Sequence, residues 1–176
     1  TMNATTQDAR RTALVEAAEQ KFGFLPNVLK QMAASPAALE AYMQGQAAVG
    51  HPGNRLTDHE RNLVQLAVSS HFDCHYCAAA HAAIGRGMGS SAAALEAAKA
   101  GTDLPAEDGG AHLEATRLLL AKQGFLTGED LAALEARGID KEVLYELIAS
   151  IGVKLISNWI NHVAGTEVDA VFVQGA

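Results

Sequence analysis

The sequence contains few residues of several types, and each scarcity excludes some classes of protein. It has only 2 cysteines and 4 prolines in 176 residues. A chain of this length can bury a core without disulfide staples. Hydrophobic residues reach 49% and charged residues 19%, and alanine is abundant. This composition favours a packed helical domain over a disordered chain.

Positive charge and long apolar runs are also scarce. The net charge is −7 and the pI is near 5.4, with Lys and Arg scattered along the chain, which argues against nucleic acid as a partner. No apolar run approaches the ~20 residues of a membrane-spanning helix, and the first residues, TMNATTQDARR, lack the apolar region of a signal peptide. We therefore expect a cytoplasmic protein that binds neither nucleic acid nor a membrane.

The alternation of apolar and polar residues that marks β-strands is missing as well. Apolar residues recur instead at spacings of three and four, which predicts an all-α fold in a single domain over residues 1–176. We expect a first helix over 6–21 and a second with Pro26 in its first turn. A third should start after Ser35 and end near Gly50.

The segment of about residues 56–89 holds both cysteines. In LTDHERNLVQLAVSS, Thr57 and Glu60 predict a capping box at a helix start. The inward stripe of this helix should be Leu63, Leu66, Ala67 and Ser70. The next stretch, DCHYCAAAHAAIGRGMG, predicts a further helix that is capped by Asp73 and stopped by its glycines.

Two helix starts in the sequence are alike. LTDHE at Leu56 recurs as LTGED at Leu126, and the helical segments that follow lead to His81 and His162. This pattern suggests a degenerate internal repeat, although chance similarity between two helix caps explains it equally well.

Cys74, Cys77 and His81 carry the clearest chemical signal. On one helix these spacings place all three side chains on the same face. A cysteine in the first turn has its thiolate stabilised by the helix dipole, which favours Cys74 as the thiol of lower pKa. One thiolate can attack a peroxide or a disulfide, the other thiol can close a disulfide, and the imidazole can move protons.

Other interpretations of the cysteine pair are weaker. A zinc site needs three or four ligands, and only one C-x-x-C is present. Haem attachment requires His directly after the second cysteine, where Ala78 stands, and a thioredoxin motif requires a preceding strand. Two inert buried thiols beside a satisfied histidine remain the plain structural alternative. We expect no bound metal or cofactor.

Three segments, ERNLVQLAVSSHFDCHYCAAAH, FGFLPNVLKQMAASPAALEAYM and ISNWINHVAGTEVD, resemble the carboxymuconolactone decarboxylase/alkylhydroperoxidase D family in its peroxidase-related branch. The resemblance implies a multi-helix bundle that assembles as a homo-oligomer and acts as a thiol peroxidase or disulfide reductase. Cys74 and Cys77 then correspond to the redox pair and His81 to the relay histidine. The second cysteine of such motifs is the more accessible attacking thiol, so the two arguments leave the attacking thiol open.

The relay of the family includes a glutamate twelve residues before the first cysteine, where this chain has Asn62. An amide does not titrate. Glu60 lies 200° away around the helix and has a structural role as the capping partner. His71 and His75 flank the motif and are candidates for passing protons in its place.

Polar and aromatic residues outside the motif are assigned mainly to structure. Asn158, Asn161 and His162 follow one another at one-turn spacings on the last long helix, where they could line the same pocket, but cross-linking of helices is the favoured role. Trp159 and Tyr42 are expected to pack in the core.

These observations predict a thiol-dependent alkylhydroperoxidase that reduces a small hydroperoxide through the Cys74–Cys77 pair. An external dithiol, of the lipoyl type, would supply the electrons. The alternatives are a redox-sensing or binding protein without turnover, and an enzyme like carboxymuconolactone decarboxylase on the same scaffold. The decarboxylase branch lacks the cysteine pair, which counts against the last alternative.

Overall fold

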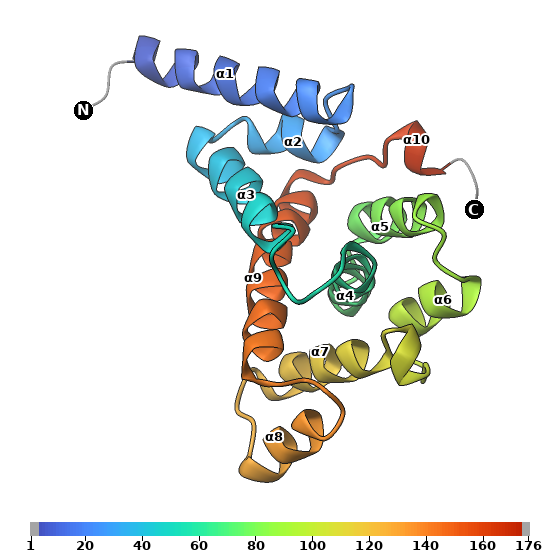
Figure 1. Ribbon diagram of the computed structural model, residues 1–176. Coiled ribbons are helices and arrows are strands. Elements are labelled where there is room, and N and C mark those ends of the chain that lie inside the picture. The colour runs from blue at the N-terminus through green and yellow to red at the C-terminus, as the bar shows by residue number, and fades with distance from the viewer. Residues whose placement is uncertain (1–3, 174–176) are drawn as a thin grey trace.

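The computed structural model describes residues 4–173, and all regular elements in that range are helical (Figure 1). The predicted all-α fold is therefore confirmed. The elements in chain order are α1 (Ala4–Phe22), α2 (Asn27–Met32), α3 (Pro36–Val49), α4 (Asp58–His71), α5 (His75–Gly87), α6 (Ala92–Ala100), the 3₁₀ turn η1 (Ala106–Asp108), α7 (Gly110–Lys122), α8 (Gly128–Glu135), α9 (Lys141–Ala164) and α10 (Ala170–Val173).

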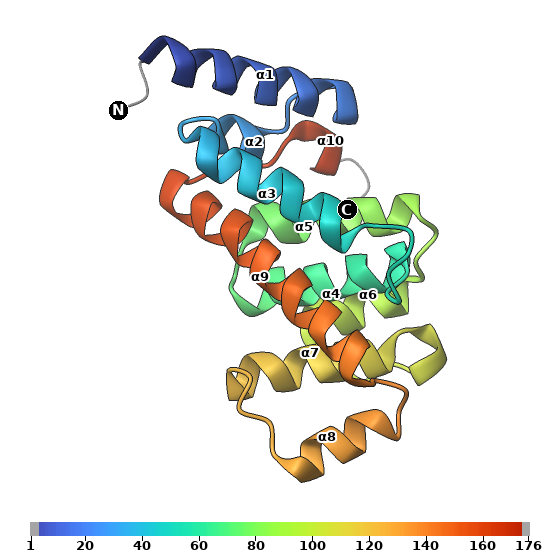
Figure 2. The same ribbon diagram turned by 60° about the vertical axis from the view of Figure 1, so that its left-hand side comes forward.

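Helix α4 lies in the middle of the bundle, where α5, α6, α7 and α9 pack around it (Figures 1 and 2). Every residue from Asn62 to Ser69 is buried, so the helix has no solvent face over two turns. The predicted stripe was too narrow, and its last member was misplaced, because Ser69 is fully buried while Ser70 is partly exposed. The pattern missed the burial of Asn62, Gln65 and Ser69 because it marks only apolar positions as inward.

Helix α9 runs along most of the length of the molecule and contacts α2, α3, α4 and α7 (Figure 2). By length and composition it is the one helix within residues 4–173 that could cross a membrane, and 39% of its apolar window is buried. Glu146 and Lys154 interrupt its apolar residues, so the expectation of no uninterrupted apolar run of membrane-spanning length is not contradicted. Packing explains part of this apolar composition, because the inner face of α9 forms one wall of the core, whereas its outer face leaves apolar side chains exposed.

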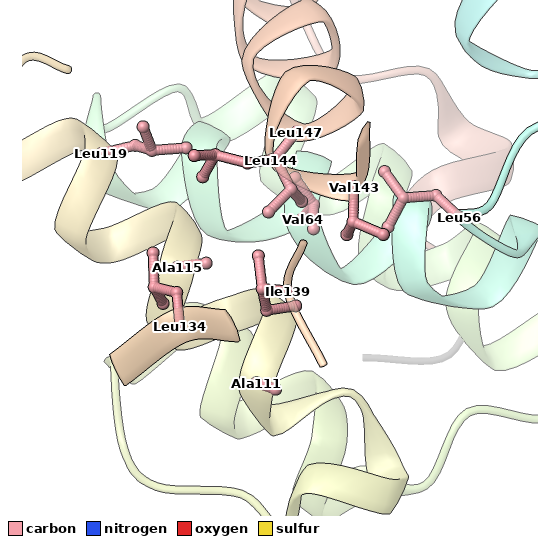
Figure 3. Packing of buried hydrophobic residues seen from close by; sticks show 10 residues of the cluster. All are labelled: Leu56, Val64, Ala111, Ala115, Leu119, Leu134, Ile139, Val143, Leu144 and Leu147. Carbon is pink, nitrogen blue, oxygen red and sulfur yellow. The ribbon is translucent and has the colours of Figure 1, made fainter. Parts of the chain in front are cut away.

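A wholly apolar cluster joins the first half of α9 to α4, α7 and α8 (Figure 3). Leu147 and Val64 are completely buried at its centre, and Leu144 and Leu119 pack beside them. Burial on this scale is the main source of stability in a domain of this size. The cluster fixes how α9 crosses α4, and that crossing determines which α9 side chains face the cysteine segment.

Most predicted helix starts are confirmed. The side chains of Ser35, Thr57 and Thr127 accept hydrogen bonds from backbone N–H groups of α3, α4 and α8. The two starts that look alike in sequence therefore both form capping boxes, with Glu60 and Asp130 as partners. Pro26, expected in the first turn of α2, is instead its N-cap residue.

The helices that follow the two boxes differ. Helix α4 has 14 residues and α8 has 8. His81 is buried, whereas His162 is exposed near the end of α9.

Candidate functional site

The chain reverses sharply between α4 and α5, and this turn places the cysteines. The N–H groups of Asp73 and Cys74 bond back to the carbonyls of Ser70 and Ser69, and Asp73 has a positive φ of 52°. Cys74 is therefore the N-cap residue of α5, and Cys77 lies in the first turn. The prediction that Asp73 caps this helix and that Cys74 lies in the first turn was wrong by one residue.

Both thiols are free and buried, with relative exposures of 2% for Cys74 and 1% for Cys77. The Cys74 thiol is hydrogen-bonded to the Cys77 sulfur. Asn161 of α9 donates from Nδ2 to Cys77 Sγ at 3.1 Å and lies 3.8 Å from Cys74 Sγ. The Oγ of Ser157 is 3.7 Å from Cys77 Sγ. The structure thus brings the two sulfurs together under a single amide.

This arrangement makes the two thiols unequal. The hydrogen bond from Cys74 lowers the pKa of Cys77 below its ordinary value of 9.0, helped by the charge of Lys154 and by contacts with Ser157 and Asn161, which together outweigh burial. The same hydrogen bond, together with burial, raises the pKa of Cys74. The helix-dipole argument that favoured Cys74 is therefore overturned, because Cys77 is the residue in the first turn.

His81 is held from both sides of its ring. Asn62 donates from Nδ2 to the backbone carbonyl of His81 at 3.0 Å, which directs Asn62 Oδ1 to the ring Nδ1 at 2.9 Å. On the other side, Lys154 Nζ is 2.8 Å from Nε2. Burial lowers the pKa of His81 well below 6.5, and the charges of Lys154 and Arg61 lower it further. The imidazole is therefore neutral.

A pocket of about 570 Å³ opens beside this group, which is ample for an organic molecule. Cys77, His81 and Lys154 line it, whereas Cys74 does not. Its walls are largely apolar, and four partly exposed side chains surround the entrance: Phe22, Phe24, Ile84 and Met88. Only the thiol of lower pKa is thus reached from the pocket.

The last turn of the described chain completes one wall of this pocket. Tyr76 donates from its hydroxyl to Asp169 at 2.6 Å, which fastens the segment before α10 to α5. Phe172 of α10 then packs edge-on against the Tyr76 ring, with 6.0 Å between ring centroids. The wall is therefore built from segments almost 100 residues apart in the chain.

Three residues considered for proton transfer lie elsewhere. His71 and His75 are exposed and do not line the pocket. Glu60 accepts from Thr57 in the capping box, and its other oxygen lies 3.5 Å from His112. Asn62, in contrast, directly contacts the ring of His81.

The chain resembles known proteins both in the sequence of one segment and in its fold. Residues 36–119, which include the cysteine segment, match the model of the Carboxymuconolactone decarboxylase family. This segment is therefore similar to the carboxymuconolactone decarboxylase family. The predicted resemblance is confirmed at the level of the family. No curated protein matches the chain by sequence.

Solved structures extend the likeness beyond the matched segment. A peroxidase-related protein from Ralstonia eutropha JMP134, described as an alkylhydroperoxidase AhpD core, is 24% identical with a TM-score of 0.80, over 94% of this chain and 87% of that one. A peroxidase-related protein from Silicibacter sp. TM1040 is 20% identical with a TM-score of 0.76, over 98% and 89%. The debrominase Bmp8 is 19% identical with a TM-score of 0.69, over 98% and 96%. At these identities the likeness establishes the shared fold.

Two residues of α9 that sequence reasoning undervalued are central to the candidate site. Lys154 was not considered, since a lysine inside an apolar helix is ordinarily read as a surface residue. Asn161 was assigned mainly to structure, yet its amide contacts both sulfurs. The one-turn spacing that Asn161 shares with Asn158 was the available signal. Asn158 does cross-link helices, through the Val68 carbonyl at 3.5 Å.

The two aromatic residues expected in the core differ. Tyr42 is partly buried and packs against a core cluster, as expected, and it also lines the pocket. Trp159 is 58% exposed on the outer face of α9, so its predicted packing role was wrong. The outer face of α9 carries further exposed apolar side chains, namely Tyr145, Ile148 and Val163.

Proposed function

We propose that this protein is a thiol-dependent reductase of organic hydroperoxides. One observation carries the proposal: the two neighbouring thiols are unequal, and the thiol of lower pKa is the one that lines a largely apolar pocket. A thiolate is the attacking form of cysteine. The match of residues 36–119 to the family and the fold shared with peroxidase-related proteins support the same role.

The reaction follows from the placement of the sulfurs. The Cys77 thiolate attacks the terminal oxygen of the hydroperoxide, the O–O bond breaks, and after protonation the products are an alcohol and a Cys77 sulfenic acid. The Cys74 thiol then attacks the Cys77 sulfur, which closes the disulfide and releases water. An external dithiol, of the lipoyl type, reduces this disulfide and restores both thiols. A reducing compartment such as the cytoplasm is the proposed setting, because it maintains such donors.

The pocket indicates the kind of hydroperoxide. Hydrogen peroxide is much smaller than 570 Å³ and would leave the aromatic entrance unused. A substrate with an apolar body would bury that body against Phe24, Leu29 and Phe172 and place its peroxide group at Cys77.

The test is steady-state consumption of cumene hydroperoxide with dihydrolipoamide as reductant. We expect turnover by the native protein and none by Cys77→Ser. Cys74→Ser should consume one equivalent and then stop, with a sulfenic acid that reacts with dimedone. Glu60→Gln is the matched control and should turn over normally, because it lies outside the pocket and keeps an oxygen for the capping box.

A redox-sensing role is the second candidate, favoured by the burial of both sulfurs, which hinders access by a bulky reductant. It predicts that hydroperoxide oxidises the pair once and that dithiols do not restore it at a useful rate. If hydroperoxide fails to oxidise the reduced pair at all, both functions are rejected.

A further inference from the structure

Lys154 has an unusual environment for a lysine. Its side chain comes from the middle of α9, is 2% exposed and lines the pocket beside Cys77. An ammonium group carries three N–H donors. Within residues 4–173 its one hydrogen-bond partner is His81 Nε2, so two donors remain for whatever enters the pocket. A buried donor without a partner is costly, and a catalytic role or a bound molecule is among the reasons for which proteins keep one.

Lys154 has no carboxylate partner among the described residues. The described part of the chain places no Asp or Glu within ion-pair distance of Lys154. Arg61 of α4 also lines the pocket, but it is paired with Asp58 at 2.7 Å. Lys21 of α1 lies at the entrance, near the Phe22 ring. Cys77 is therefore the group on the pocket floor whose negative charge can balance Lys154.

His81 is unable to serve as the proton donor in this geometry. Asn62 Oδ1 is an acceptor only, so the ring nitrogen facing it, Nδ1, carries the hydrogen. The ammonium of Lys154 is a donor only, so Nε2 supplies its lone pair to Lys154. Both nitrogens are occupied, and the neutral ring has neither a proton to give to the pocket nor a free lone pair.

We propose that Lys154, oriented by His81 and Asn62, is the catalytic acid of this site: its ammonium balances the Cys77 thiolate and protonates the oxygen that leaves when the peroxide bond breaks. The inference rests on the proposed function for its substrate. Asn62 then holds His81, and His81 holds Lys154, so the amide has a positioning role without titrating.

Protons and electrons balance in the resulting cycle. Cys77 sulfur bonds to the terminal oxygen, the O–O bond breaks, and the departing alkoxide takes a proton from Lys154 to become an alcohol. Cys74 sulfur then displaces hydroxide from the Cys77 sulfenic acid, and the Cys74 proton converts this hydroxide to water. The external dithiol supplies two electrons and two protons, of which one returns to Cys74 and one to Lys154, while Cys77 leaves as the thiolate.

Two variants separate charge from proton donation. Lys154→Met keeps the length and apolar stem without the charge, and Lys154→Arg keeps a charge but holds its proton too firmly to donate it. The matched control is Lys21→Met, which removes another lysine of the same pocket. Thermal unfolding and circular dichroism establish that each variant is folded.

The first measurement is the absorbance of the thiolate near 240 nm against pH. Because an opposite charge nearby favours the ionised thiol, Lys154→Met should raise the pKa of Cys77 by about one unit or more, whereas Lys154→Arg and Lys21→Met should leave it near the native value. An unchanged pKa in Lys154→Met would refute the charge pair. This readout requires no substrate, so it stands even if the proposed function fails.

The second measurement is the rate of Cys77 oxidation by two peroxides whose leaving groups differ. Cumene hydroperoxide releases a strongly basic alkoxide, whereas peracetic acid releases acetate, which needs no proton. Lys154→Met and Lys154→Arg should lose about 10²-fold more rate with the hydroperoxide than with the peracid. Equal losses with both peroxides would show that Lys154 is not the acid, while turnover of the native protein would still support the proposed function.

If Lys154→Met fails to fold, the native protein provides an independent test by ¹⁵N NMR. His81 should remain a neutral ring protonated at Nδ1 from pH 5 to pH 8. A His81 ring that gains a proton within that range would overturn the proposal.

Discussion

The two halves of α9 are built differently although they belong to one unbroken helix. The first half buries Val143, Leu144 and Leu147 in the apolar cluster with α4 and α7 (Figure 3). The second half buries polar side chains against α4 and α5, namely Lys154, Ser157, Asn158 and Asn161.

The difference shows how stability and chemistry are divided along the helix. Apolar burial needs only complementary shape, so the first half fixes the crossing of α9 over α4. A buried polar donor also needs a partner, and in the second half the side-chain nitrogens find theirs in the cysteines, His81 and the Val68 carbonyl. The rigid first half therefore supports the arrangement of the second.

The largest expected effect on stability comes from the apolar half. Leu147→Ala should lower the free energy of unfolding by about 2–5 kcal/mol, because Leu147 is fully buried and its truncation leaves a cavity. Urea unfolding of the reduced protein measures this change. Ile148→Ala is the matched control on the next residue, which is 45% exposed, and should change stability by no more than about 0.5 kcal/mol. Equal losses of stability in the two variants would contradict the view that the buried apolar face of the first half of α9 supplies the stability.

The polar half should make stability depend on pH through His81. Its pKa is lowered in the folded state, by burial first and then by Lys154 and Arg61, so below pH 6.5 the unfolded chain binds a proton that the folded protein does not. The free energy of unfolding is then full above pH 6.5 and falls as the pH is lowered, by at most about 1.4 kcal/mol per pH unit for this residue.

Urea unfolding at pH 7.5, 6.0 and 5.0 measures this slope in the native protein and in His81→Gln. Part of the slope should remain in the variant, because burial also lowers the pKa of His112. If His81→Gln and the native protein show the same slope, His81 is charged in the folded state and the description of the polar half is wrong.

The smallest expected effect is on the pKa of Cys77, and it should differ between substitutions of two asparagines one turn apart on α9. Asn161→Leu removes an N–H donor from Cys77 Sγ and should raise the pKa of Cys77 by less than about one unit, because Cys74, Lys154 and Ser157 also lower this pKa. Asn158→Leu should leave that pKa unchanged, because Asn158 contacts the Val68 carbonyl. The rate of alkylation by iodoacetamide against pH measures both. A larger shift in Asn158→Leu would contradict the assignment.

Features that depend on neighbours in sequence were predictable. Ser35 and Thr57 cap their helices as expected because an N-cap bonds to an N–H only two or three residues ahead. The same logic failed by one residue at Asp73, where the backbone turns through a positive φ and Cys74 bonds back to Ser69. Whether a short polar residue caps a helix or forms such a turn depends on where the next helix must pack.

The helical class, the main helix starts and the C-x-x-C-x-x-x-H group could be derived from the order of residues, because all of these arise from spacings within a few residues. The tertiary structure alone decided which thiol has the lower pKa and which residue supplies positive charge. His81 and Lys154 are 73 residues apart in the chain, and their 2.8 Å contact exists only because the apolar half of α9 fixes the way that helix crosses the bundle. Electrostatic effects depend on distance and burial in space, and neither can be read from order along the chain.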